Sequence, residues 1–135
     1  MGNHGADYDH TFRGCTMEKN VLREKTFSFS VQVIRLYRVL AKNRGDEVLA
    51  RQLLRSATSI GANVREAVYG VSRADFVAKL QIALKETAET EYWLELLQET
   101  GALEKSTALQ LLQQCLEIKR ILIATLKTTK GDSSS

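Results

Sequence analysis

The sequence predicts an all-α protein: an antiparallel up-and-down four-helix bundle, assembled into a cyclic homo-oligomer. The 135 residues include no proline, the residue that a helix interior tolerates least. Apolar residues recur at steps of three and four over most of the chain, which is the period of an amphipathic helix. Glycines at positions 45, 70 and 101 separate these runs, as expected where helices end.

The chain is long enough for one domain with a single core. We expect the bundle to span residues 21–128. We expect the segment 1–20 to lie outside the fold, either disordered or extraneous. Residues 1–16 contain both histidines and no periodic apolar pattern, and they can come from an expression vector or an upstream start codon, with Met17 as the native start. Residues 129–135, which include GDSSS, are predicted to form a disordered tail.

The first two helices are predicted over about 26–42 and 46–69. The first ends near Gly45, for which we expect a left-handed conformation, and Asp46 can cap the second. The predicted buried stripe of the first helix is Phe27, Val31, Ile34, Tyr37 and Ala41. That of the second is Leu49, Leu53, Ala57, Ile60, Val64 and Ala67.

The third helix, about 73–100, has the clearest start. Ser72 can cap it, Asp75 occupies the reciprocal capping-box position, and Val71 can pack against Phe76 as a hydrophobic staple. Its predicted buried stripe alternates steps of four and three: Phe76, Leu80, Ala83, Thr87, Thr90, Leu94 and Leu97. Gly101 ends it. So short a turn after Gly70 folds the second and third helices back on each other.

The fourth helix, about 106–127, has more apolar residues than one face can hold. They are Leu109, Leu111, Leu112, Leu116, Ile118, Ile121, Leu122, Ile123 and Leu126. Either this helix is central and buried all round, or one of its faces contacts another subunit. We favour subunit contact in a closed homo-oligomer.

Several kinds of active site are not indicated. Glu86, Glu89 and Glu91 lie close together, but a di-metal site needs inward Glu-x-x-His motifs and no histidine follows His10. Cys15 and Cys115 have no CxxC spacing, and Cys115 has no histidine near it in the fold to activate it. No glycine-rich phosphate loop occurs. We therefore predict no enzyme activity, metal or cofactor.

The expected cellular location depends on two features that the sequence does not show, a membrane span and a signal peptide. No apolar run approaches the roughly 20 residues of a membrane span. The first residues have no apolar core of the signal-peptide type. We therefore expect a cytoplasmic protein with no membrane partner.

Polar residues occupy positions of the second and third helices where apolar ones are expected. Antiparallel folding brings Ser56 and Ser59 level with residues 83–87, and Arg55 within reach of Glu86 or Glu89. One interpretation is a polar pocket in the bundle. The favoured one is close helix packing, with hydroxyls bonded to carbonyls and a structural ion pair that fixes the register.

Charge distribution is the one positive functional signal. Residues 21–73 hold ten Lys or Arg and four acids, whereas residues 74–105 hold three and seven. Arg35, Arg38 and Lys42 form a strip on the first helix, and Arg44 and Arg51 lie near its end. Such a strip can neutralise phosphates. It can also be an ordinary solvated face, or contact the acidic half of another subunit.

The runs LLRSATSIGANVREA (53–67) and SRADFVAKLQIALKETAETEYWLELL (72–97) resemble a known family. It is the four-helix bundle family encoded within intervening sequences of bacterial 23S rRNA genes, also called S23-like ribosomal proteins. The resemblance covers about 27–126 and implies a ring of five subunits. The positions that fit its polar signature are Arg55, Ser56, Ser59, Asn63, Glu66, Glu86, Glu89 and Thr90, with Phe76, Lys79 and Trp93 beside them.

The sequence is also similar to the accessory variability proteins of diversity-generating retroelements. These are basic pentameric barrels that bind a reverse transcriptase and nucleic acid, so the likeness draws attention to the basic strip without assigning a function. Two hypotheses remain. The protein is an oligomeric module that binds RNA or DNA through the first helix, or it is a scaffold that recognises a polypeptide partner.

Overall fold

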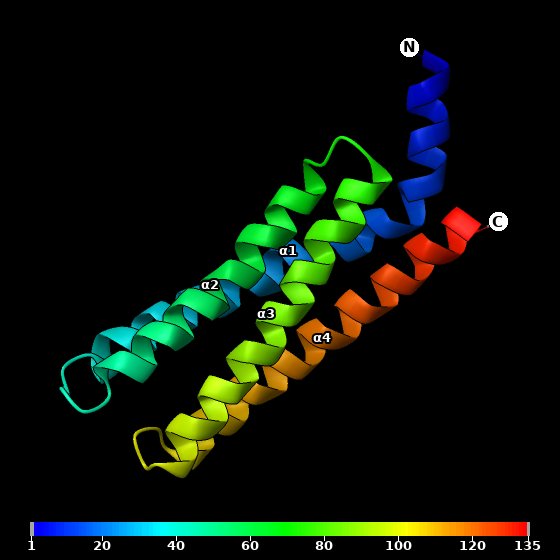
Figure 1. Ribbon diagram of the computed structural model, residues 1–135. Helices are drawn as coiled ribbons and strands as arrows, with labels where there is room; N and C mark the ends of the chain where they lie inside the picture. Colours follow the sequence, from blue (N-terminus) through cyan, green and yellow to red (C-terminus); the bar gives the residue numbers. More distant parts are fainter. Residues whose placement is uncertain (1, 135) are drawn as a thin grey trace.

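The computed structural model describes the backbone of residues 2–134 and the side chains of residues 17–131. It contains four helices: α1 Gly2–Leu40, α2 Glu47–Val68, α3 Arg73–Glu99 and α4 Lys105–Ser134. Each helix packs against two neighbours, in the cyclic order α1, α2, α3, α4. Figure 1 shows the antiparallel up-and-down arrangement, with both ends of the chain at the same end of the bundle. The predicted four-helix bundle is therefore confirmed.

The outer helices extend past their predicted limits. α1 begins at Gly2 and α4 continues to Ser134, although we expected helices from about Thr26 and up to Lys127, with segments 1–20 and 129–135 outside the fold. No proline precedes Thr26, so the helix can extend toward the N-terminus without a break. The hydroxyl of Thr125 donates to Glu18 Oε2 at 2.9 Å, so the packed region includes residue 18. The first part of α1 leaves the bundle at an angle (Figure 1).

The buried stripe of α3 is confirmed at all seven predicted positions. In α2 the predicted residues are buried except Leu49, which is half-buried; Ala50 and Ser56 are buried as well. In α4 the inward face consists of Ala108, Leu111, Cys115, Ile118, Leu122 and Leu126. Burying one Leu or Phe side chain stabilises the fold by roughly 1.5–3 kcal/mol.

The predicted stripe of α1 is wrong. Phe27 is 59% exposed, and the residues that face the core are Leu22, Thr26, Phe29, Val33 and Leu40. Both sets have helical spacing, because apolar residues alternate along 27–33 and supply two neighbouring stripes. Packing against α2 and α4 selects the stripe that contains Phe29.

The helix ends follow the predictions in part. Ser72 caps α3, since its hydroxyl oxygen accepts from the backbone N–H of Asp75 at 3.1 Å. Val71 is 90% exposed, so the hydrophobic staple is wrong. Asp46 holds the N-cap position of α2 without a side-chain cap. Gly101 has a φ of 82°, but Gly45 does not adopt the left-handed conformation expected for it.

Candidate functional site

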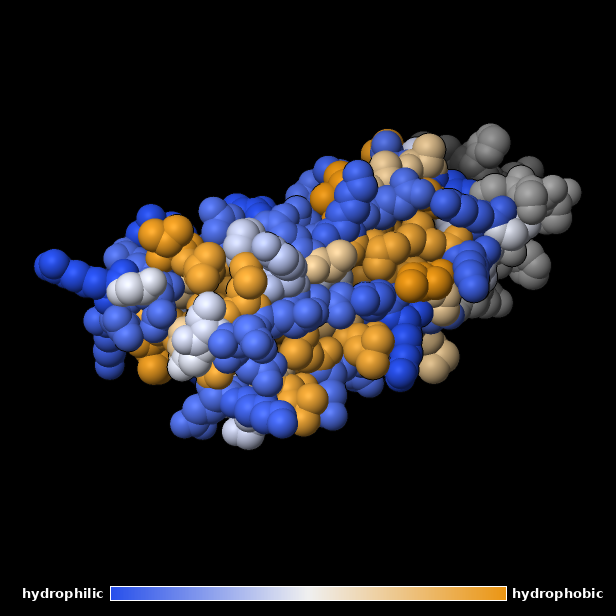
Figure 2. All heavy atoms as spheres, turned by 60° about the horizontal axis from the view of Figure 1, so that its bottom comes forward, coloured by the Kyte–Doolittle hydropathy of each residue, from blue (hydrophilic) through white to orange (hydrophobic). Residues whose placement is uncertain are grey.

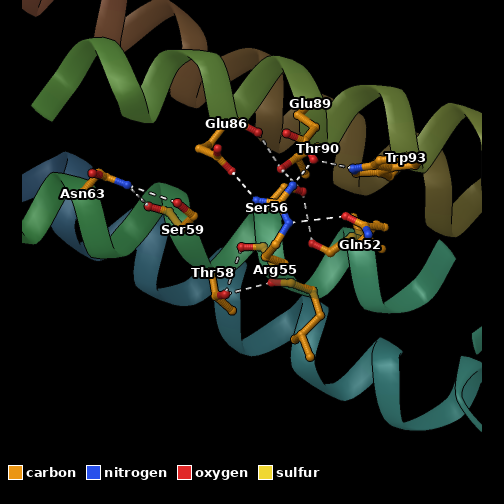
Figure 3. Close-up of polar contacts among 12 residues, drawn as sticks. Gln52, Arg55, Ser56, Thr58, Ser59, Asn63, Glu86, Glu89, Thr90 and Trp93 are labelled. Carbon is orange, nitrogen blue, oxygen red and sulfur yellow. Dashed lines mark hydrogen bonds and ion pairs between the residues drawn. The ribbon is translucent and has the colours of Figure 1, made fainter. Parts of the chain in front are cut away.

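A polar network joins α2 and α3 at the middle of the bundle (Figure 3). The guanidinium of Arg55 contacts two carboxylates of α3, Glu86 at 3.3 Å and Glu89. The indole N–H of Trp93 donates to the same oxygen of Glu89 at 2.9 Å. The predicted contacts of Arg55 are confirmed, with both glutamates as partners.

The network keeps its charged members charged. The hydrogen bond to Glu89 raises the pKa of Arg55, and the Trp93 indole, followed by Arg55, holds the pKa of Glu89 below its ordinary value. A catalytic acid or base instead needs a pKa near the working pH. The pairing therefore indicates a structural role that fixes how α2 and α3 align.

The remaining signature residues lie along the same contact. Ser56 and Thr90 are buried with their hydroxyl oxygens 2.9 Å apart, which places Ser56 about one turn further along α3 than predicted. Thr90 also lies 2.8 Å from the carbonyl of Glu86. The amide of Asn63 donates to the carbonyl and hydroxyl oxygens of Ser59.

At the far end of the contact, Lys79 pairs with Glu66 at 2.9 Å. Six of the eight predicted positions therefore make polar contacts between α2 and α3, whereas Ser59 and Asn63 bond to each other within α2. No buried polar atom of the described side chains lacks a hydrogen bond, as expected of close helix packing rather than a polar pocket.

Cys115 is fully buried in α4. Burial raises the pKa of its thiol to about 12, so the thiol stays protonated and is no nucleophile at neutral pH. Cys15 and the two histidines fall outside the described side chains. Among residues 17–131 no three His, Cys, Asp or Glu side chains gather closely enough to hold a metal ion.

The basic strip (Arg35, Arg38 and Lys42) is exposed, with Arg35 and Arg38 on α1 and Lys42 in the turn that follows Leu40 rather than on the helix as predicted. Arg44, in the α1–α2 loop, and Arg51, in the second turn of α2, are exposed as well. Arg51 pairs with Glu47 at 2.6 Å, whereas the other four cations have no ionic or hydrogen-bond partner among the described side chains. By contrast Lys25, Arg55, Lys79 and Lys119 are all held in ion pairs between helices.

The surplus apolar residues of α4 are on its surface, so this helix is not buried all round within the subunit. Leu109, Leu116 and Ile123 are exposed at seven-residue intervals, which puts them on one face. We call them the α4 stripe. Figure 2, which brings the lower side of the Figure 1 view forward, shows hydrophobic patches separated by hydrophilic residues.

The sequence interpretation missed a second surface beside α1. Phe27, assigned to the core, lines a groove between α1 and α2 together with Arg23 and Arg65. Tyr69, one turn after Arg65, is 72% exposed. The signal was present in the sequence, since Phe27 lies on the same face of the helix as Arg23 and Arg38.

Fold and surfaces together define a small all-helical bundle protein that pairs its central charges internally and exposes cations on α1 and an apolar stripe on α4. Within the described residues, no helix has the length and apolar character to cross a membrane.

The family model of the 23S rRNA-intervening sequence proteins matches residues 18–124, and the chain belongs to that family. A similar solved structure is a Bacteroides thetaiotaomicron protein of unknown function from the S23 ribosomal protein family. It is 44% identical, with a TM-score of 0.79, over 82% of this chain and 98% of that one. The search of curated proteins found no match. Neither the family nor the structural neighbour indicates a catalytic activity.

Proposed function

We propose that this protein is a non-enzymatic, homo-oligomeric module that binds RNA or DNA through the basic strip. One observation carries the proposal: Arg35 and Arg38 of α1, and Lys42 in the turn after it, are exposed and have no counter-charge among the described side chains. Unpaired cations in a row suit a polyphosphate backbone, because binding them releases counterions from the nucleic acid. Arg44 at the end of α1 extends the same surface.

The test is fluorescence anisotropy with single-stranded and duplex RNA and DNA at about 50 and 200 mM salt. We expect tight binding at the lower concentration and a steep loss at the higher one. Changing Arg35, Arg38 and Lys42 to Glu should abolish binding while leaving the oligomer intact. A matched control changes Lys85, Arg120 and Lys127 to Glu, since these exposed cations on α3 and α4 alter the net charge equally. Because Arg120 and Lys127 lie on the face of the α4 stripe, the control is valid only if its mass in solution equals that of the wild type.

If both triple variants weaken binding alike, net charge and not the strip attracts the nucleic acid. If wild-type protein does not bind even at low salt, the proposed function is wrong.

The α4 stripe supports self-association. Three exposed apolar side chains on one face fit a contact with another helix, and the family resemblance suggests a ring of five subunits. Light scattering gives the mass in solution. Leu116→Lys should lower that mass, whereas Gln110→Lys, an exposed position on another face of α4, should not.

The same stripe favours the second candidate function, a scaffold that recognises another polypeptide. A monomeric wild-type protein would direct attention to it. A partner recovered in pull-downs after nuclease treatment, and lost in Leu116→Lys, would support that function over nucleic-acid binding.

A further inference from the structure

A groove of about 360 Å³ runs between α1 and α2, and we call it the α1–α2 groove. It is lined by Arg23, Phe27 and Ser30 of α1 and by Gly61 and Arg65 of α2, among others. The helices approach closely here, because a Cβ on Gly61 would lie only 3.4 Å from Ser30 Oγ. The small residues therefore lie at the bottom of the groove, and the larger side chains form its sides.

The walls combine an aromatic ring with positive charge. Phe27 is 59% exposed, and the guanidinium of Arg65 lies 6.0 Å from the centre of its ring. Arg23 lines the same groove and no carboxylate does, while Glu24 lines a neighbouring hollow that shares Arg23, Phe27 and Arg65. An exposed ring beside two arginines suits a ligand with a flat apolar part and a negative part.

A second exposed aromatic ring continues this surface. Tyr69 lines an adjoining hollow of about 540 Å³, and Arg65 belongs to both hollows. Glu66, Asp75 and Lys79 also line this second hollow, and Glu66 is paired with Lys79. Arg65 thus lies between an exposed Phe and an exposed Tyr. Aromatic side chains alternating with arginine are the means by which proteins bind single strands, with bases stacked on the rings and phosphates on the cations.

We propose that the α1–α2 groove holds an unstacked base of single-stranded RNA or DNA against Phe27, with Arg23 and Arg65 on the flanking phosphates. This inference rests on the proposed function and adds a preference for single strands. At about 1.5 Å per residue, Phe27 lies roughly 16 Å along α1 from Arg38. A few nucleotides of one strand therefore extend from the groove to the basic strip.

The experiment compares Phe27→Leu with wild type, using labelled single strands of about 12 nucleotides and the corresponding duplexes. Loss of the ring should weaken single-strand binding by about tenfold or more. Duplex binding should not change, because its bases stay stacked. Phe27→Tyr should retain single-strand affinity. Tyr92→Leu, which removes an exposed ring of α3 far from the groove, is the matched control.

The outcomes separate this inference from the proposed function. If the triple variant of the basic strip loses binding but Phe27→Leu binds single strands as wild type does, the groove is not used and the proposed function stands. If Phe27→Leu changes the solution mass rather than the affinity, the groove is a subunit contact and the inference is overturned. Absence of binding by wild type overturns both.

Discussion

The α2–α3 contact and the outer face of α1 both carry arginine and aromatic side chains, yet they use them differently. Between α2 and α3, Arg55 and Trp93 converge on Glu89, and each buried polar side-chain atom has a partner. On α1, Arg35 and Arg38 point outward without a counter-charge, and Phe27 is exposed. Residue type alone therefore does not identify a binding surface. The useful criterion is that the charged side chains have no counter-charge among the described residues and that the aromatic side chain is exposed.

The largest expected effect is a difference in the free energy of unfolding between variants of a buried and an exposed phenylalanine. Phe76 is 2% exposed and Phe27 is 59% exposed. Phe76→Ala should lower the free energy of unfolding by about 3–5 kcal/mol, because it leaves a cavity in the core. Phe27→Ala should cost about 0.5 kcal/mol or less. Urea unfolding at equal protein concentration measures both, and equal losses would mean that Phe27 is packed in the assembled protein.

A smaller effect is expected at the α2–α3 network. Arg55→Ala removes the partner of two glutamates but is half exposed, so we expect a loss of about 1 kcal/mol. A double-mutant cycle with Glu89→Gln isolates the pair. Arg51→Ala, which breaks an exposed pair within one helix, should cost less. If the cycle gives no coupling energy between Arg55 and Glu89, apolar packing alone sets the register of α2 and α3.

The smallest effect is the pH dependence contributed by Glu89. Its pKa is lowered from the ordinary value of 4.5, chiefly by the Trp93 indole. The stabilisation is therefore complete above about pH 4.5 and is lost as the pH falls through the lower folded-state value. The difference in unfolding free energy between wild type and Glu89→Gln should shrink over that range. A difference that stays constant with pH would contradict the assigned pairing.

Local pattern was enough to predict α3, because it has a capping serine and an apolar stripe at regular steps of four and three that is buried at every position. It was not enough for α1, where two stripes compete and the neighbouring helices decide. The α2–α3 network was predictable because antiparallel folding about a short turn fixes which residues are level. The α1–α2 groove was not, since it depends on the wrongly assigned Phe27 and on Arg65 from another helix.

The placement of both chain ends at one end of the bundle has a practical consequence (Figure 1). An affinity handle or surface tether attached at either terminus holds the molecule by that end. The α1–α2 loop, with Arg44, lies at the opposite end and points into solution. Immobilised protein should thus present the basic end freely to a ligand in flow, whereas a handle inserted into that loop would obstruct it.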